Sequence, residues 1–170
     1  FPQSFHNTVD AREYIEKLRM LFPKAPLVCE FRHKSWWNPD TLRFLKELDI
    51  SMSSVDAPEI SNLPSRGEIY TAEPAYLRLH GRNKDAWFEG GREARYTYRY
   101  NKDELSEWLR KMKKLLVKSG DIYIAFNNHP FGYSAMNATE FLEMLREIMP
   151  DSVPKRKLSL KSDSDQPTLF

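Results

Sequence analysis

The chain has 170 residues, of which 41% are hydrophobic and 13% are aromatic. This size and composition support one domain with a real hydrophobic core and exclude an intrinsically disordered protein. The 26 lysines and arginines nearly balance the 24 aspartates and glutamates, and the formal net charge is +2. This balance excludes a global field that would by itself attract nucleic acid or an anionic membrane, so such a partner needs a local patch.

A single cysteine, Cys29, excludes an intramolecular disulfide and any multi-cysteine metal site. This cysteine usage suits a reducing compartment, and we expect a cytoplasmic protein. No apolar run approaches the roughly 20 residues of a membrane span, and no secretory signal pattern is present, so we expect no membrane partner. The chain starts at Phe1 rather than at a methionine, and we expect further residues to precede it.

The first half of the chain contains start signals for two helices. Asn7 or Thr8 can cap a helix whose apolar residues recur at helical spacing. Asn38 followed by Pro39 supplies an N-cap and a proline at the first helical position. The elements expected here are, in order, a helix over 11–22, a strand over 27–32, a helix over 39–48 and a strand over 50–55 that ends at Asp56.

The second half repeats the order of strand and helix after a proline-rich loop. Asn101 and Glu104 form a capping-box pattern, and Ser134 can open the last helix. The intervening stretch 81–100 has no convincing period, and connections of this length are usually functional or mobile. The elements expected here are a strand over 75–80, a helix from 101 that Gly120 closes, a strand over 121–127 and a helix from 134 to 148.

Four alternating strand and helix units with short crossovers predict an α/β fold with a parallel sheet. A complete eight-stranded TIM barrel typically needs about 250 residues. The chain therefore predicts either part of a TIM-barrel-like fold or an open sheet with helices on its faces. The hydrophobic period ends at Pro150, so we expect a domain over 1–150 and a flexible, disordered tail over 151–170.

Polar residues gather where three strand-like runs end. Three of the four histidines, His33, His80 and His129, fall in these places. Because polar side chains rarely follow buried strands without a reason, and because the carboxyl ends of parallel strands converge, we expect one shared site there. The runs with these endings are 27–33, 76–82 and 122–129.

Four motifs in this order closely resemble the YecE-like family, a domain of unknown function, over about residues 1–149. The resemblance implies a TIM-barrel-like fold with an architecture similar to that of sugar isomerases. It also implies that this chain covers the carboxyl-terminal half of the barrel, with the earlier strands preceding Phe1. The motifs are Glu30-Phe31-Arg32-His33-Lys34-Ser35-Trp36-Trp37, Tyr76-Leu77-Arg78-Leu79-His80-Gly81-Arg82, Tyr98-Arg99-Tyr100, and Phe126-Asn127-Asn128-His129 with Ala135-Met136-Asn137-Ala138.

Strand alternation puts Glu30 and Arg32 on one face, and Arg78 and His80 on another. If both faces point inward, these groups must pair with one another or with a ligand, because unpaired burial is costly. One interpretation is an ion-pair network that only braces the fold. We favour an anionic ligand, because arginines outnumber acids here and planar guanidinium groups suit phosphate or carboxylate. We predict that Arg78 and Glu30 lie within salt-bridge reach.

Three residues are candidates for acid–base chemistry: Glu30, His80 and Asp56. Imidazole titrates near neutral pH, so His80 can donate a proton, and Asp56 or Glu30 can act as base. The same three groups are an alternative set of metal ligands. This set is looser than the clusters of carboxylates and histidines that hold metals, so we expect neither a metal nor another cofactor.

The expected ligand-binding residues follow the strands. Asn127 and Asn128 can bind hydroxyl or phosphate oxygens, or can instead cap the next loop. Trp36 can stack on a ligand, or can pack beneath its loop. Asn137, inside the last helix, is expected to hydrogen-bond back to the 126–129 turn. The ligand-binding set is Arg32, His33, Trp36, Arg78, Asn127, Asn128 and His129.

A second hypothesis is a nucleic-acid-associated accessory protein. Residues 78–99 carry a local excess of positive charge among aromatic side chains, which suits nucleic acid, although we favour a solvated lid over the barrel mouth as the explanation of this segment. The terminal Gln166-Pro167-Thr168-Leu169-Phe170 resembles peptides that dock on sliding clamps, with Gln166, Leu169 and Phe170 as contacts. A third interpretation is a half-barrel without independent activity, so the sequence leaves open whether the protein is an enzyme.

Overall fold

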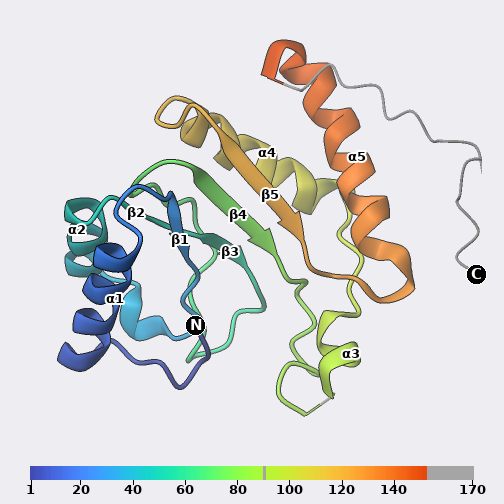
Figure 1. The fold of residues 1–170 in the computed structure, drawn as a ribbon. Coiled ribbons are helices and arrows are strands. Elements are labelled where there is room, and N and C mark those ends of the chain that lie inside the picture. Colours follow the sequence, from blue (N-terminus) through green and yellow to red (C-terminus); the bar gives the residue numbers. More distant parts are fainter. Residues whose placement is uncertain (90, 153–170) are drawn as a thin grey trace, which may run out of the picture.

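The computed structural model describes residues 1–89 and 91–152 (Figure 1). These residues form a mixed α/β fold with parallel strands in two sheets. Short 3-10 helices follow three of the elements, at Lys34–Trp36, Pro130–Gly132 and Pro150–Ser152. The helices are α1 Val9–Leu21, α2 Pro39–Glu47, α3 Gly91–Tyr96, α4 Lys102–Leu116 and α5 Tyr133–Ile148; the strands are β1 Leu27–Cys29, β2 Ile50–Met52, β3 Ser54–Asp56, β4 Ala75–Leu79 and β5 Ile122–Phe126.

The two sheets meet at Ser53. β1 pairs with β2, and β3 pairs with β4, which pairs with β5. The run expected over 50–55 is thus divided between two sheets, although the Ser53 amide still donates to the Cys29 carbonyl at 2.9 Å. β1 is shorter than expected because its partner β2 ends at Met52, opposite Cys29. The parallel pairing predicted from the sequence is confirmed for all three strand pairs.

The start signals of three helices act as the sequence predicts. The Thr8 hydroxyl accepts the Ala11 amide, and the Asn38 side chain accepts the Thr41 amide. Asn101 and Glu104 form both bonds of a capping box at the start of α4. The expected cap of α5 is wrong, because that helix begins at Tyr133 after Gly132, whose φ of 72° suits glycine.

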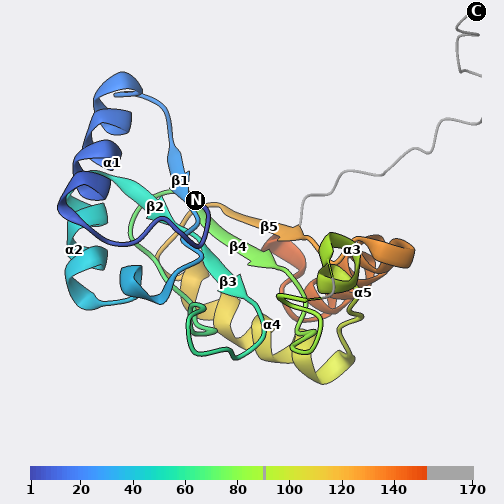
Figure 2. The same ribbon diagram turned by 90° about the horizontal axis from the view of Figure 1, so that it is seen from below.

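The helices cover the strands in two groups, as Figures 1 and 2 show: α1 and α2 lie beside β1 and β2, and α4 and α5 lie beside β4 and β5. Each group has its own buried core. Trp36, Leu45 and Ile50 belong to the first core, and Leu77 and Trp108 belong to the second. The short α3 lies beyond the carboxyl ends of β4 and β5. The 81–100 connection, expected without regular structure, therefore contains a helix that faces the strand ends.

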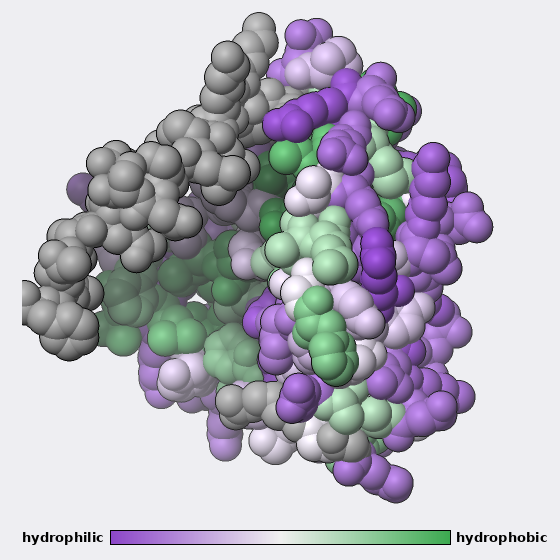
Figure 3. All heavy atoms as spheres, turned by 90° about the vertical axis from the view of Figure 1, so that its right-hand side faces the viewer, coloured by the Kyte–Doolittle hydropathy of each residue, from purple (hydrophilic) through white to green (hydrophobic). Residues whose placement is uncertain are grey.

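The surface seen from the side of α5 is mostly hydrophilic, with hydrophobic side chains exposed in places (Figure 3). Exposed large hydrophobic side chains in this part of the chain include Phe131, Met136 and Ile148. Scattered exposure of this kind is normal for a protein surface and indicates no site by itself. In the ranges that the structure describes, no helix is both long enough and apolar enough to cross a membrane.

Candidate functional site

Glu30 is the centre of the polar cluster at the strand ends. Its Oε2 accepts Arg78 Nη1 at 3.1 Å, and its Oε1 accepts Arg32 Nε at 3.2 Å and lies 3.1 Å from His80 Nε2. The predicted salt bridge between Arg78 and Glu30 is therefore confirmed. It joins residues 48 positions apart. These residues come together because β1 pairs in parallel with β2, and the chain continues from β2 through Ser53 into β3, which pairs in parallel with β4.

Asn127 completes this network and fixes the tautomer of His80. Its Nδ2 lies 3.0 Å from His80 Nδ1, and its Oδ1 accepts Arg78 Nη2 at 3.3 Å. An imidazole that carries its proton on Nε2 satisfies both neighbours, because Nε2 then donates to Glu30 and Nδ1 accepts from the amide. The orientation of the amide is set in turn by Arg78, which can only donate.

The network keeps Glu30 ionised. Burial opposes its charge, but the hydrogen bond from His80 and the charges of Arg78 and Arg32 outweigh burial and lower the pKa of Glu30 to about 2. At neutral pH this carboxylate is a weak base with both oxygens occupied. Glu30 is therefore better placed to orient Arg78, Arg32 and His80 than to remove a proton from a ligand.

Beside Glu30 lies a cavity of about 540 Å³, which we call the arginine pocket. Three arginines line it: Arg32 and Arg78 follow from the strand pattern, whereas Arg95 comes from α3. Arg95 is held by a 2.6 Å bond from its Nε to the Trp87 carbonyl. The pocket is lined by Arg32, Arg78, Gly91, Arg95, Tyr96, Asn127 and His129.

A second cavity, of about 150 Å³, adjoins the first and shares Arg32, Arg95 and Tyr96 with it. We call it the aromatic cavity. Glu30 and His80 form part of its wall. The rest is mainly apolar and includes Phe31, Val55, Ala57, Leu63, Trp87 and Phe88.

Asp56, expected as a general base, lines neither cavity. It is completely buried, and its carboxylate accepts Arg82 Nη2 at 2.7 Å, the Tyr100 hydroxyl at 2.8 Å and Trp108 Nε1 at 2.6 Å. Arg82 also pairs with Glu104 on α4. These contacts correct the expectation, because the carboxylate is enclosed by protein donors and ties the segment after β4 to α4.

The two asparagines at the end of β5 have different environments. Asn127 lines the arginine pocket, whereas Asn128 is completely buried and donates to the Tyr98 carbonyl at 2.8 Å and to Asn137 Oδ1 at 2.9 Å. The bond expected from Asn137 back to this turn is therefore present. Asn128 serves the loop, which is the alternative that the sequence left open for it, and it is not placed to bind a ligand.

Two further expected ligand contacts lie away from both cavities. Trp36 is completely buried, donates to the Phe5 carbonyl and stacks on Phe31 with ring centroids 4.3 Å apart. It packs in the core, so it cannot stack on a ligand. His33 caps the 3-10 helix after β1, because its Nδ1 accepts the Ser35 amide. Desolvation and the neighbouring charges of His6 and Lys34 lower the pKa of His33.

The basic excess over 78–99 is smaller than the sequence suggests. Arg82 pairs with Asp56, Arg99 with Glu140, and Arg78 with Glu30. The proposed clamp contacts Gln166, Leu169 and Phe170, with the rest of the tail from 153, lie outside the described residues.

Arg95, Tyr96 and Trp87 are the site residues that sequence reasoning did not single out. All three belong to the stretch 81–100, whose position after a strand and richness in arginine and aromatic residues were the available signal. These three side chains come together because of the turn before α3 and α3 itself. Neither segment has a hydrophobic periodicity from which its structure could be predicted.

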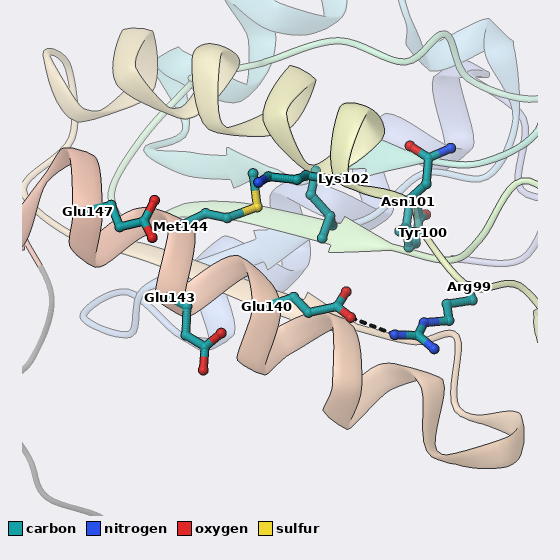
Figure 4. Close-up of a pocket in the computed structure, with 9 residues that line it drawn as sticks. Arg99, Tyr100, Asn101, Lys102, Glu140, Glu143, Met144 and Glu147 are labelled. Carbon is teal, nitrogen blue, oxygen red and sulfur yellow. Dashed lines mark hydrogen bonds and ion pairs between the residues drawn. The ribbon is translucent and has the colours of Figure 1, made fainter.

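A groove of about 530 Å³ lies between α4 and α5, away from the strand-end residues (Figure 4). Its charged groups include Arg99 and Lys102 opposite Glu140, Glu143 and Glu147 of α5. Arg99 Nη2 and Glu140 Oε1 are 2.6 Å apart. This internal pairing makes the groove a weaker candidate than the arginine pocket. Within 1–89 and 91–152, no group of three or more His, Cys, Asp or Glu side chains is arranged to hold a metal ion.

Comparison with known proteins finds relatives that match most of this chain. The UPF0759 protein YunF of Bacillus subtilis is 32% identical over 171 residues, which cover 94% of this chain and 60% of YunF. A DUF72 family protein from Thermotoga maritima gives a TM-score of 0.82 at 38% identity, over 86% of this chain and 55% of that one. A DUF72 family protein from Enterococcus faecalis gives a TM-score of 0.80 at 29% identity, and the match covers 92% of this chain and 60% of that one.

The chain thus spans little more than half the length of these relatives. The model of the family described as "Protein of unknown function DUF72" matches residues 1–158. Because this match covers most of the sequence, the chain belongs to the DUF72 family.

Proposed function

We propose that this chain binds a phosphorylated or otherwise anionic polar small molecule in the arginine pocket. The observation that carries the proposal is an imbalance of charge: Arg32, Arg78 and Arg95 line the site, and Glu30 is its one carboxylate among the described residues. Glu30 neutralises one guanidinium group, and two positive charges remain. An anionic ligand balances them and occupies their donors.

Two arginines of the pocket have donors that such a ligand can use. Arg32 donates through Nε to Glu30, and Arg95 donates through Nε to the Trp87 carbonyl. In the described part of the chain, the terminal nitrogens of these two arginines make no hydrogen bond. Each pair of terminal nitrogens can form parallel bonds to a phosphate or carboxylate. Asn127 and His129 supply further polar groups on the same wall.

Binding is the primary role in this proposal, and any reaction follows from it. Both ring nitrogens of His80 are hydrogen-bonded inside the network, and Glu30 is a weak base. Proton transfer to a ligand requires the ligand to displace Asn127 or Glu30 from the imidazole. Glu30 and His80 are therefore proposed first as groups that hold Arg78 and Arg32 in position.

The order of parallel strand and helix units supports the view that the chain is part of a TIM-barrel-like fold, as the resemblance to the YecE-like family implies. In such barrels ligands bind at the carboxyl ends of the strands, where the arginine pocket lies. The single cysteine, buried at Cys29, agrees with a cytoplasmic protein.

Titration calorimetry with inorganic phosphate tests the proposal. We expect saturable binding with a Kd on the order of 1 mM for this minimal probe. Arg95→Gln should weaken binding about tenfold or more, because it removes charge-assisted hydrogen bonds. Arg110→Gln, the same substitution at an exposed site on α4, should leave the affinity unchanged. Equal affinities of wild type and Arg95→Gln, or no saturable binding, would contradict the proposal.

A further inference from the structure

The arginine pocket and the aromatic cavity form two parts of one site, and we propose that its ligand is an aryl anion. By this we mean an anionic group joined to one compact aromatic ring, as in an aryl phosphate or aryl carboxylate. The inference rests on the proposed function, because it assigns the body of the ligand whose anionic group the arginines bind. The inference thus limits the proposed anionic ligand to one chemical class.

The two cavities are joined through Arg32, Arg95 and Tyr96, which line both. The Arg95 side chain marks the boundary. Its guanidinium carbon lies 5.7 Å from the centre of the Trp87 ring, and its Nε binds the carbonyl of the same residue. A ligand bound to the terminal nitrogens of Arg95 therefore lies next to the aromatic wall.

The size of the aromatic cavity fits a single ring. Its volume is about 150 Å³. An apolar cavity of this volume stays dry and binds benzene in a well-studied protein of another family.

The walls favour an apolar body over one rich in hydroxyl groups. Ala57, Leu63 and Val55 are buried and offer no hydrogen bonds to a ligand. The polar groups at the inner wall, Glu30 and His80, are already hydrogen-bonded to each other. Hydroxyl groups of a sugar ring that faced these three apolar side chains would stay unpaired, which costs binding energy.

The aromatic residues also have a suitable arrangement. Trp87 and Tyr96 cross at 80° with ring centres 6.2 Å apart, and the His80 ring lies 5.9 Å from Tyr96. All three rings line the aromatic cavity. An aromatic guest can therefore make edge-to-face contact with one ring while it stacks on another.

The test compares three probes that carry the same anion: inorganic phosphate, phenyl phosphate and glycerol 3-phosphate. We expect phenyl phosphate to bind about 10- to 100-fold more tightly than phosphate, as the burial of one ring predicts. Glycerol 3-phosphate should bind no more tightly than phosphate. Benzoate against acetate repeats the comparison and shows which anion the arginines prefer.

A cavity-filling variant locates the ring. Ala57→Leu places a larger side chain in the aromatic cavity and should reduce the preference for phenyl phosphate over phosphate to near one. Leu63→Phe, in the loop after β3, fills the same space and replaces Ala57→Leu if that variant does not fold. Ala135→Leu, a matched substitution at an exposed site on α5, should keep the wild-type preference.

The outcomes separate this inference from the function on which it rests. If wild type binds phosphate but binds phenyl phosphate no more tightly, the aryl ligand is excluded and the anion site stands. If the preference survives in both Ala57→Leu and Leu63→Phe, the ring lies elsewhere and the inference fails. If neither phosphate nor phenyl phosphate binds, the proposed function fails with it.

Discussion

Replacement of Asp56 by asparagine is expected to lower the free energy of unfolding by about 3–5 kcal/mol, the usual cost of breaking a buried ion pair. The groups that face this carboxylate, from Arg82, Tyr100 and Trp108, all donate hydrogen bonds. The Tyr100 hydroxyl also accepts the Gly81 amide, so its own proton is directed to Asp56. An asparagine NH₂ would therefore place a donor against donors and leave Arg82 without its main partner.

Urea unfolding of wild type and Asp56→Asn measures this loss. The matched control is Asp40→Asn on α2, where the aspartate side chain is 71% exposed and pairs only with the nearby Arg43 among the described residues. That control should change the free energy of unfolding by no more than about 0.5 kcal/mol. If Asp56→Asn behaved like the control, the buried network could not be the brace between the 81–100 segment and α4.

Acidification should remove the stabilisation that Glu30 provides. The folded pKa of Glu30 is about 2, below the ordinary value of 4.5, so its contribution is complete above about pH 4.5 and is lost as the pH falls towards 2. A difference of this size corresponds to about 3 kcal/mol. The free energy of unfolding of wild type, minus that of Glu30→Gln, should therefore be constant near neutral pH and shrink across this window.

Chemical unfolding at a series of pH values checks this expectation. Glu13→Gln serves as the control, because Glu13 is exposed on α1 and, within 1–89 and 91–152, forms an ion pair only with Lys17, at 4.0 Å. An exposed pair of this kind contributes little to stability. The expectation is contradicted if the free energies of unfolding of wild type and Glu30→Gln differ by a constant amount from pH 6 to pH 2. The arginines and His80 would then not stabilise the ionised carboxylate of Glu30.

The sequence predicted the parts of the site that depend on strand pattern. Alternation along β4 places Arg78 and His80 on one face, and the parallel order brings them to Glu30 at the end of β1. Local signals such as the capping box of Asn101 predicted where helices begin. These features depend on short-range chemistry or on one topological rule, so a single sequence is enough to infer them.

Other parts of the site depend on tertiary contacts that no local pattern encodes. Asp56 is the last residue of β3, and Glu30 directly follows β1, so the two positions look alike in the sequence. The environment of Asp56 differs because Trp108, 52 residues away, donates a hydrogen bond to its carboxylate. Trp36 belongs to the first motif, but its side chain packs in the core instead of lining the cavity. Arg95 reaches the pocket because α3 folds back over the strand ends. Each of these outcomes required knowledge of what packs against the residue.

The central claim is that Arg32, Arg78 and Arg95 bind one anion together. NMR of the arginine Nε–Hε groups during titration with phosphate tests this claim most directly, because each signal reports on one guanidinium group. Assignment uses single Arg→Lys variants at the three positions. The exposed Arg43 and Arg110 provide internal references in the same sample.

We predict that the signals of Arg32, Arg78 and Arg95 shift along saturating curves with one common Kd, while those of Arg43 and Arg110 show only small, linear changes. Contradiction would come from two results: no saturating shift at any of the three pocket arginines, or shifts no larger than those of the two references.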